Sequence, residues 1–180
     1  MSISAVSAGK DVPESVNVVI EIPMNSSFVK YEVDHDSGVL SVDRFFTAPM
    51  FYPANYGFIP QTLGLDGDPL DVLVVTPHPL LPGSVIECRP IGMLLMEDDG
   101  GQDPKLLALP AASVWPECAE IDSLDGMSEQ LLTQIEHFFK HYKDLDCGKW
   151  TKTSGWTSAE DAKSEIKASI QRFAQNGGAA

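Results

Sequence analysis

The stretch Asp66-Gly67-Asp68-Pro69-Leu70-Asp71-Val72-Leu73-Val74-Val75-Thr76 places three carboxylates at the start of a strong β-strand pattern. Carboxylates about 6 Å apart repel each other by roughly 0.7 kcal/mol in water and by about 3 kcal/mol at an effective dielectric near 20. Gly67 and Pro69 prevent a regular helix, so the acids cannot spread along one solvated helical face. We therefore expect one or more hard divalent cations with oxygen ligands to hold them together.

Length and composition indicate how many domains the chain forms and which classes of partner it can bind. With 180 residues, 43% of them hydrophobic, we expect a single domain over 1–180 with a substantial core and frayed termini. A net charge of −14 argues against nucleic acid or an acidic membrane as partner and favours cations. No apolar run is long enough to span a membrane, and residues 1–10 do not resemble a signal peptide, so a cytoplasmic location is expected. Cys88, Cys118 and Cys147 are widely spaced, which indicates reduced thiols.

The first two thirds of the chain has the pattern of short strands separated by Pro and Gly. Several short strands with this punctuation are typical of a closed or partly closed β-barrel. The expected strands are Asn17–Ile22, Phe28–Val33, Val39–Phe46, Leu70–Thr76, Ser84–Met96 and Lys105–Leu109.

The last third is predicted to be helical. The first helix begins at Glu129, ends near Lys143, and has an apolar face formed by Leu131, Leu132, Ile135, Phe138, Phe139 and Tyr142. A second helix is expected to open with the capping box Thr157-Ser158-Ala159-Glu160. One face of this helix is expected to carry Ala162, Ile166, Ile170 and Phe173. Two helices packed on a small barrel make an α+β domain.

A second group of acids, Asp98, Asp99 and Asp103, follows a later expected strand. Because the two groups of aspartates adjoin different strands, they can converge at one end of a barrel. Glu21 and Glu32, each on an early strand, can add to the same rim. Two groups of this kind favour a metal site over solvated loop acids.

Several of the few basic residues lie close to acids in the sequence. Lys30 precedes Glu32 by two residues, so both side chains are expected on one face of a strand. Arg44, Lys105 and the pair Tyr142-Lys143 complete a set typical of a metal-bridged phosphate site. Arg binds phosphate through two hydrogen bonds, Lys supplies a point charge and Tyr donates a hydrogen bond. The sequence contains no P-loop, no G-x-S-x-G motif and no H-E-x-x-H motif.

The chain carries an ordered series of motifs in the segments Val19–Pro23, Lys30–Glu32, Val42–Phe45, Met50–Gly57, Asp66–Val72, Pro82–Val85, Asp103–Lys105 and His137–Lys143. This series resembles that of a known family, the soluble family I inorganic pyrophosphatases of the bacterial type. The resemblance covers about residues 15–172. Asp99 and Phe58 depart from the family pattern, in which Glu and Tyr are common at these positions. Neither departure removes a matched site residue.

The resemblance implies a fold and a set of metal ligands. The fold is a small closed five-stranded β-barrel (OB-like) with additional short strands and two packed α-helices. Asp66, Asp71 and Asp103 match the carboxylates that hold two activating Mg²⁺ ions, and Asp98 matches a ligand for further metal ions. Asp68 matches the acid that accepts a proton from the attacking water.

The resemblance also assigns the residues around substrate. The phosphate-binding set is matched by Lys30, Arg44, Tyr56, Tyr142 and Lys143. Supporting residues of the cavity are matched by Glu21, Glu32, Tyr52 and Lys105.

The reaction implied by the resemblance is Mg²⁺-dependent hydrolysis of pyrophosphate to two orthophosphates, by in-line attack of a metal-bridging water or hydroxide. It further implies several Mg²⁺ ions per subunit, with Mn²⁺ or Zn²⁺ as substitutes, pyrophosphate bound as its metal complex, and a homohexamer with His137 and His141 as contact residues. On the residues alone, two other hypotheses stay open. One is a non-catalytic β-barrel that binds metal or oligonucleotide, and the other is a related hydrolase that prefers an organic diphosphate.

Overall fold

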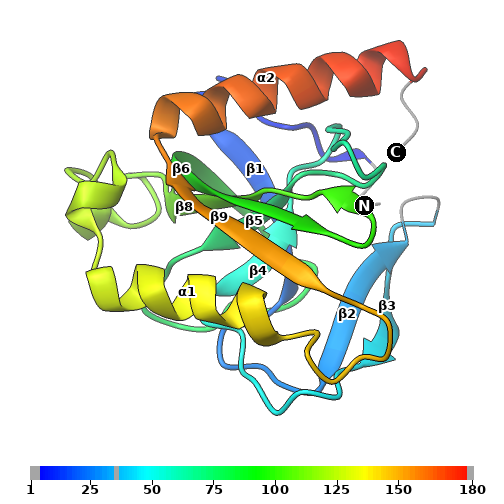
Figure 1. The fold of residues 1–180 in the computed structure, drawn as a ribbon. Coiled ribbons are helices and arrows are strands. Elements are labelled where there is room, and N and C mark those ends of the chain that lie inside the picture. The colour runs from blue at the N-terminus through cyan, green and yellow to red at the C-terminus, as the bar shows by residue number, and fades with distance from the viewer. Residues whose placement is uncertain (1–4, 35–36, 178–180) are drawn as a thin grey trace.

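The computed structural model describes residues 5–34 and 37–177, and its central feature is a mixed sheet that closes on itself (Figure 1). The five strands of the ring are β1 Val16–Ile22, β4 Asn55–Phe58, β5 Asp71–Val74, β6 Val85–Asp98 and β8 Lys105–Pro110. They follow the order β1-β4-β5-β8-β6, and β6 pairs back onto β1. The predicted α+β fold with a closed ring of five strands is confirmed. The expected fraying of the termini falls partly outside the described residues.

Further elements surround this ring. Two strands, β7 Gly101–Gln102 and β9 Thr151–Thr157, extend the sheet by pairing with β6. A separate hairpin is formed by β2 Val29–Asp34 and β3 Val39–Phe45. The α-helices are α1 Glu129–His141 and α2 Ala159–Gln175, and short 3₁₀ turns lie at Pro116–Cys118 and Leu124–Gly126. No helix in the described part of the chain has the length and apolarity needed to cross a membrane.

Three strands were missed by the sequence patterns: β4, β7 and β9. Strand β4 is only Asn55-Tyr56-Gly57-Phe58, and Asn and Gly are both depleted in strands. The expectation that the last third is helical throughout is wrong, because β9 lies between the two helices. Strand β9 carries Gly155 at φ +93° and is ordered by pairing along β6.

Both faces of the sheet are buried, each under one helix (Figure 1). Consecutive side chains of a strand point to opposite faces, so Leu73 joins the core under α1 while Val72 and Val74 join the core under α2. This two-sided burial explains why every residue of β8 is buried, including the charged residue Lys105. The fold thereby places a lysine inside the molecule.

The N-cap of the second helix is Ser158, one residue later than the predicted N-cap Thr157. Ser158 is the N-cap and accepts a hydrogen bond of 3.2 Å from the Asp161 N–H, while the Asp161 carboxylate accepts one of 3.1 Å from the Ser158 N–H. Thr157 is not free to cap the helix because it ends β9 and pairs with Met93. Ala162 and Ile166 of the predicted face are buried in the core and half-buried Ile170 packs against it, whereas Phe173, also half-buried, is not part of that cluster.

Candidate active site

A polar cavity of about 250 Å³ brings both groups of aspartates together. Its acids are Asp66, Asp68, Asp71, Asp98, Asp99 and Asp103, its bases are Lys30, Arg44, Lys105, Lys143 and Lys149, and its tyrosines are Tyr52, Tyr56 and Tyr142. A smaller adjoining cavity is lined by Glu21 and Glu32 and shares Asp68 and Asp71 with the first. Every site residue expected from the sequence therefore lines one of two connected cavities.

Strand register explains how residues distant in the sequence meet here. Strands β5 and β8 are parallel neighbours, with Val72 opposite Leu106. Asp71 and Lys105, one residue earlier on each strand, therefore begin the two strands side by side. The turn between β6 and β7, where Asp98 pairs with Gly101, returns the chain so that Asp103 reaches the same place.

A tight turn holds the first group of aspartates on one side. The Gly64 N–H donates a 2.6 Å hydrogen bond to the Asp68 carbonyl, and the Asp68 N–H donates one of 3.2 Å to the Asp66 carboxylate. Gly67 has φ +100°, a conformation that side chains with Cβ rarely adopt. The turn thus presents the Asp66 and Asp68 side chains at the rim of the cavity instead of along a helix.

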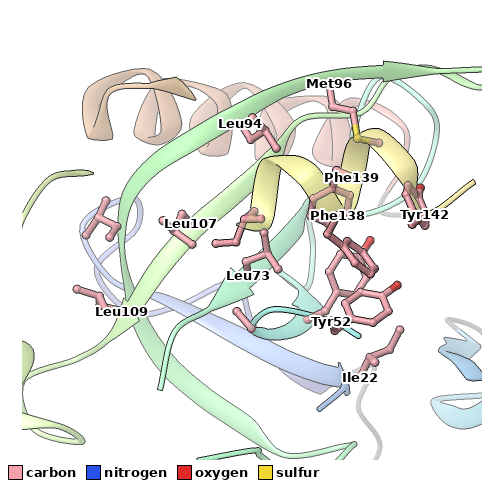
Figure 2. Close-up of a cluster of buried hydrophobic side chains, with 14 of the residues drawn as sticks. Ile22, Tyr52, Leu73, Leu94, Met96, Leu107, Leu109, Phe138, Phe139 and Tyr142 are labelled. Carbon is pink, nitrogen blue, oxygen red and sulfur yellow. The ribbon is translucent and has the colours of Figure 1, made fainter. Parts of the chain in front are cut away.

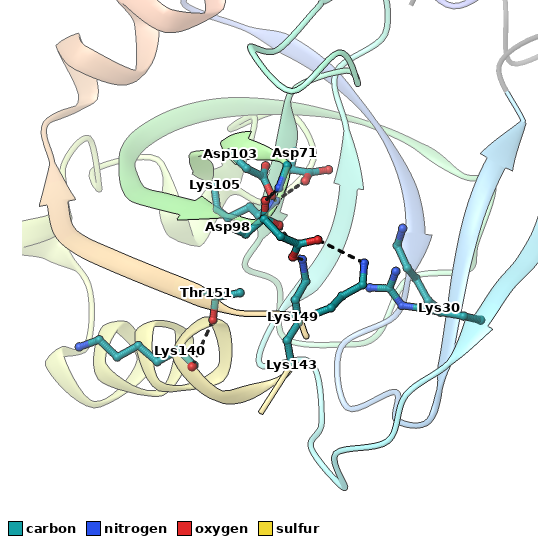
Figure 3. Close-up of polar contacts among 12 residues, drawn as sticks. Lys30, Asp71, Asp98, Asp103, Lys105, Lys140, Lys143, Lys149 and Thr151 are labelled. Atoms are coloured by element: carbon teal, nitrogen blue, oxygen red, sulfur yellow. Dashed lines mark hydrogen bonds and ion pairs between the residues drawn. The ribbon is translucent and has the colours of Figure 1, made fainter. Parts of the chain in front are cut away.

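Lys105 is the central cation of the site (Figure 3). Its buried ammonium donates hydrogen bonds to the Asp71 carboxylate and, at 2.5 Å, to the Asp103 carboxylate. It also lies 5.8 Å from the ring centre of Tyr56 and 5.7 Å from that of Phe139. Burial disfavours the charge, but the two carboxylates outweigh it and raise the pKa of Lys105 well above its usual value. Lys105 therefore stays protonated.

The other cations of the cavity are also paired with carboxylates. Lys143 contacts Asp98 at 2.5 Å, while Lys30 contacts Glu32 at 3.0 Å and Asp43 at 3.2 Å. The Lys30–Glu32 contact confirms that both side chains share one face of β2. Six acids and five bases line the larger cavity, so its lining is close to neutral although the chain as a whole carries −14.

Lys149 is a cavity residue that sequence reasoning missed. Lys149 belongs to the loop between α1 and β9, and its ammonium lies 3.5 Å from the Asp99 carboxylate. The segment Gly148-Lys149 matches no phosphate-binding motif, so only its position a few residues after Lys143 could have suggested it.

Arg44 lines the cavity and has one unsatisfied donor. Its Nε–H is buried and has no hydrogen-bond partner among the described residues. A buried donor without a partner is costly, and a guanidinium suits a phosphate oxygen. As a guanidinium in the cavity lining, Arg44 is a candidate to bind a phosphate oxygen.

Aromatic contacts position the three tyrosines, and Figure 2 shows Tyr52 and Tyr142 beside Phe138. The ring of Tyr52 lies 4.6 Å from Phe138 and 5.2 Å from Tyr56, and Tyr142 stacks on Phe138 at 5.4 Å. Because Phe138 and Tyr142 both come from the end of α1, this helix orients one side of the site. Burial raises the pKa of all three phenols, so they remain hydrogen-bond donors.

Burial raises the pKa of three carboxyl groups of the two cavities: Asp66, Asp103 and Glu21. Burial raises the pKa of Asp103 to about 6, and repulsion from Asp71 adds to this effect while Lys105 opposes it. Burial also raises the pKa of Glu21 to about 8, although the Val33 N–H donates a 2.7 Å hydrogen bond to its carboxyl group. Perturbed acids in a cavity are typical of functional sites.

The donor set suits a hard divalent cation. Asp66, Asp71, Asp98 and Asp103 offer carboxylate oxygens, which Mg²⁺ and similar ions prefer. Among residues 5–34 and 37–177, however, no three acidic, histidine or cysteine side chains converge into a coordination shell. The ammonium of Lys105 lies between two of the carboxylates instead, so the ligands fit in chemistry and would have to rearrange around an ion.

Comparisons with known proteins agree on one family. The family described as "Inorganic pyrophosphatase" matches residues 18–174. The inorganic pyrophosphatase of Escherichia coli K12 is 56% identical over 172 residues, which cover 96% of this chain and 98% of that protein. That of Vibrio parahaemolyticus is 54% identical over 176 residues, 98% of this chain and 99% of that protein.

Solved structures give the same result. The inorganic pyrophosphatase of Coxiella burnetii superposes with a TM-score of 0.90 at 51% identity, covering 93% of this chain and 99% of that chain. That of Thermus thermophilus superposes with a TM-score of 0.90 at 41% identity, covering 97% and 99%.

Proposed function

The chain belongs to the inorganic pyrophosphatase family and hydrolyses pyrophosphate to orthophosphate, and on this premise we propose that the carboxylate-lined cavity is its active site. The observation that carries the proposal is the meeting of two distant aspartate groups with five cations in one cavity. Pyrophosphate is strongly anionic, and such a lining can bind both its phosphate groups and the cations that accompany it.

Membership of the family implies a divalent metal cofactor. We propose Mg²⁺, several ions per subunit, with Mn²⁺ or Zn²⁺ as substitutes. Asp66, Asp71 and Asp103 would hold the activating ions, and Asp98 would hold an ion that arrives with pyrophosphate. When bound, such ions lower the pKa of a water and neutralise phosphate charge. Glu21 and Glu32 line the adjoining cavity and would support this site from outside.

Asp68 is proposed as the general base. It lines both cavities, together with Asp71, Lys30 and Tyr56. In the reaction the water oxygen forms a bond to one phosphorus, the bridging P–O bond breaks, and the Asp68 carboxylate accepts the proton of the water. The two products are orthophosphates.

The remaining cavity residues are proposed to bind phosphate. In phosphoryl transfer the protein contributes mainly positioning and stabilisation of charge. The charge on the leaving phosphate would be stabilised by Lys30, Arg44 and Lys143. The phenols of Tyr56 and Tyr142 would donate hydrogen bonds. Tyr52 and Lys105 would support this arrangement from the cavity wall.

A phosphate-release assay tests the proposal. Purified protein is incubated with pyrophosphate in the presence of Mg²⁺ or of EDTA, and with a nucleoside triphosphate in parallel. We expect release from pyrophosphate that requires the metal. Release that persists in EDTA would contradict the metal assignment, and preferential release from the nucleotide would indicate an organic substrate.

We also propose that the chain assembles as a homohexamer. The support is a third cavity, of about 450 Å³, against α1, lined by residues that include Met50, Phe51 and His137. Phe51 is 60% exposed, and the rings of His137 and His141 lie 4.5 Å apart on the same helix. An exposed aromatic beside an apolar hollow is typical of a subunit contact.

A cytoplasmic location and a single domain over 1–180 are proposed as well. The first is supported by free thiols at Cys88, Cys118 and Cys147, since a reducing compartment keeps cysteines unpaired. The second is supported by the family match over residues 18–174.

A further inference from the structure

Lys105 occupies a position that a purely phosphate-binding lysine does not require. Its ammonium lies between Asp71 and Asp103, with hydrogen bonds to both carboxylates (Figure 3). The side chain is 3% exposed, whereas Lys149, at the edge of the cavity, is 41% exposed. Lys105 is therefore part of the interior of the site and cannot turn away into solvent.

The strands fix this position. Lys105 begins β8 and Asp71 begins β5, and the two strands are paired in parallel with Val72 opposite Leu106. The rings of Tyr56 and Phe139 flank the ammonium at 5.8 and 5.7 Å. Backbone pairing and aromatic packing thus hold the charge between the two acids.

Asp71 and Asp103 repel each other, and Lys105 offsets this repulsion. A buried carboxylate pair without a counter-charge is unfavourable, so the ammonium stabilises the paired arrangement. A divalent cation bound by the same two carboxylates would meet this positive charge at close range. Lys105 and the metal therefore compete for one pair of ligands.

We propose that Lys105 is the internal counter-ion of Asp71 and Asp103, which keeps the two carboxylates together and weakens binding of the divalent metal by competing with it. This inference rests on the proposed function, because it takes both aspartates as metal ligands. By linkage, the same competition makes the metal weaken the contacts of the ammonium with its carboxylates.

Metal titration of Lys105→Met tests the competition. Calorimetry with Mg²⁺ alone is expected to give binding at least about tenfold tighter than in the wild type. Thermal unfolding is expected to give a lower Tm in EDTA and a larger rise in Tm on saturation with Mg²⁺. Lys152→Met is the matched control, because Lys152 is 67% exposed and pairs with Glu97 on the neighbouring strand. It should leave both quantities unchanged.

The outcomes separate this inference from the proposed site. Unchanged or weaker Mg²⁺ binding in folded Lys105→Met would overturn the counter-ion role. If instead Asp71→Asn and Asp103→Asn both bind Mg²⁺ as the wild type does, the proposed metal site itself fails.

A measurement on the unaltered protein covers the case in which Lys105→Met does not fold. The NMR signal of the Lys105 side chain, assigned by its loss in Lys105→Arg, should move during Mg²⁺ titration and stop moving at saturation. Lys163, which contacts Glu14 at 2.7 Å on the surface, serves as the internal reference. A Lys105 signal that stays fixed while Mg²⁺ binds would contradict the proposal.

Discussion

At the scale of single residues, Asp68 lines both cavities, as Asp71 does, but it does so from an exposed turn. Asp66 precedes it in the same turn, and Asp71 follows it at the start of β5. Asp68 therefore shares a cavity with the proposed metal ligands and the proposed phosphate-binding cations. An exposed carboxylate in this cavity is the reason why we propose it as the proton acceptor.

Asp68→Asn is expected to lower kcat by about 10² to 10⁴, because an amide of the same size cannot accept the proton of the attacking water. Phosphate release measures the effect, and circular dichroism and Mg²⁺ calorimetry check that fold and metal binding are retained. Asp122→Asn, at an exposed carboxylate outside both cavities, should keep wild-type turnover. Wild-type activity in Asp68→Asn would refute the assignment of the base.

Glu21 is expected to make stability depend on pH. Burial raises its pKa from 4.5 to about 8, so between these values the folded chain holds a proton that the unfolded chain has released. The free energy of unfolding therefore falls as pH rises through this window. Asp103, with a pKa of about 6, contributes in the same direction only at lower pH.

Glu21→Gln removes the titrating group and keeps an acceptor for the Val33 N–H. We expect a shallower fall in stability between pH 6 and 8, with a gain at pH 8 of up to about 4 kcal/mol. Urea unfolding at several pH values, in the presence of EDTA, measures the free energy of unfolding of both proteins. Glu120→Gln, at an exposed position, serves as control, and equal slopes in wild type and Glu21→Gln would show that Glu21 does not titrate in this range.

At the scale of elements, the start of α2 shows how a local pattern is shifted by its neighbours. Both Thr157 and Ser158 are good N-cap residues by type. Pairing of Thr157 with Met93 makes it the last residue of β9, so the cap moves to Ser158. The capping partner moves with it, from Glu160 to Asp161.

Ser158→Ala is expected to destabilise the protein by about 1 kcal/mol, since it removes the acceptor of the Asp161 N–H. Thr157→Val keeps the shape and strand preference of threonine and should cost clearly less. Urea unfolding of the two variants compares them. A larger loss in Thr157→Val would mean that the helix begins at the residue indicated by the sequence pattern.

At the scale of the whole molecule, the surface beside α1 is the proposed subunit contact. Phe51→Glu puts a charge on a side chain that is 60% exposed next to the apolar hollow, and we expect it to shift the assembly towards smaller species. Sedimentation velocity measures the shift. Val114→Glu, at another exposed apolar side chain, should sediment as the wild type does. Unchanged sedimentation of Phe51→Glu would place the contact elsewhere.

The sequence alone determined the features that depend on neighbours along the chain. The helical spacing of Ile135, Phe138 and Phe139 identified a buried face, and the charges crowded around Gly67 predicted a cation beside them. The resemblance of the ordered motifs to a known family indicated that family and predicted the residues of its site. Such features follow from local sterics, charge and periodicity, which act over a few residues.

Only the tertiary structure decided which charges meet. The closure of β6 on β1, the order of β4 within the ring and the position of Lys149 depend on contacts between distant segments. Above all, the parallel register of β5 and β8 places Lys105 between Asp71 and Asp103. Because water does not screen charges in the interior, the buried ammonium of Lys105 strongly affects the two carboxylates beside it.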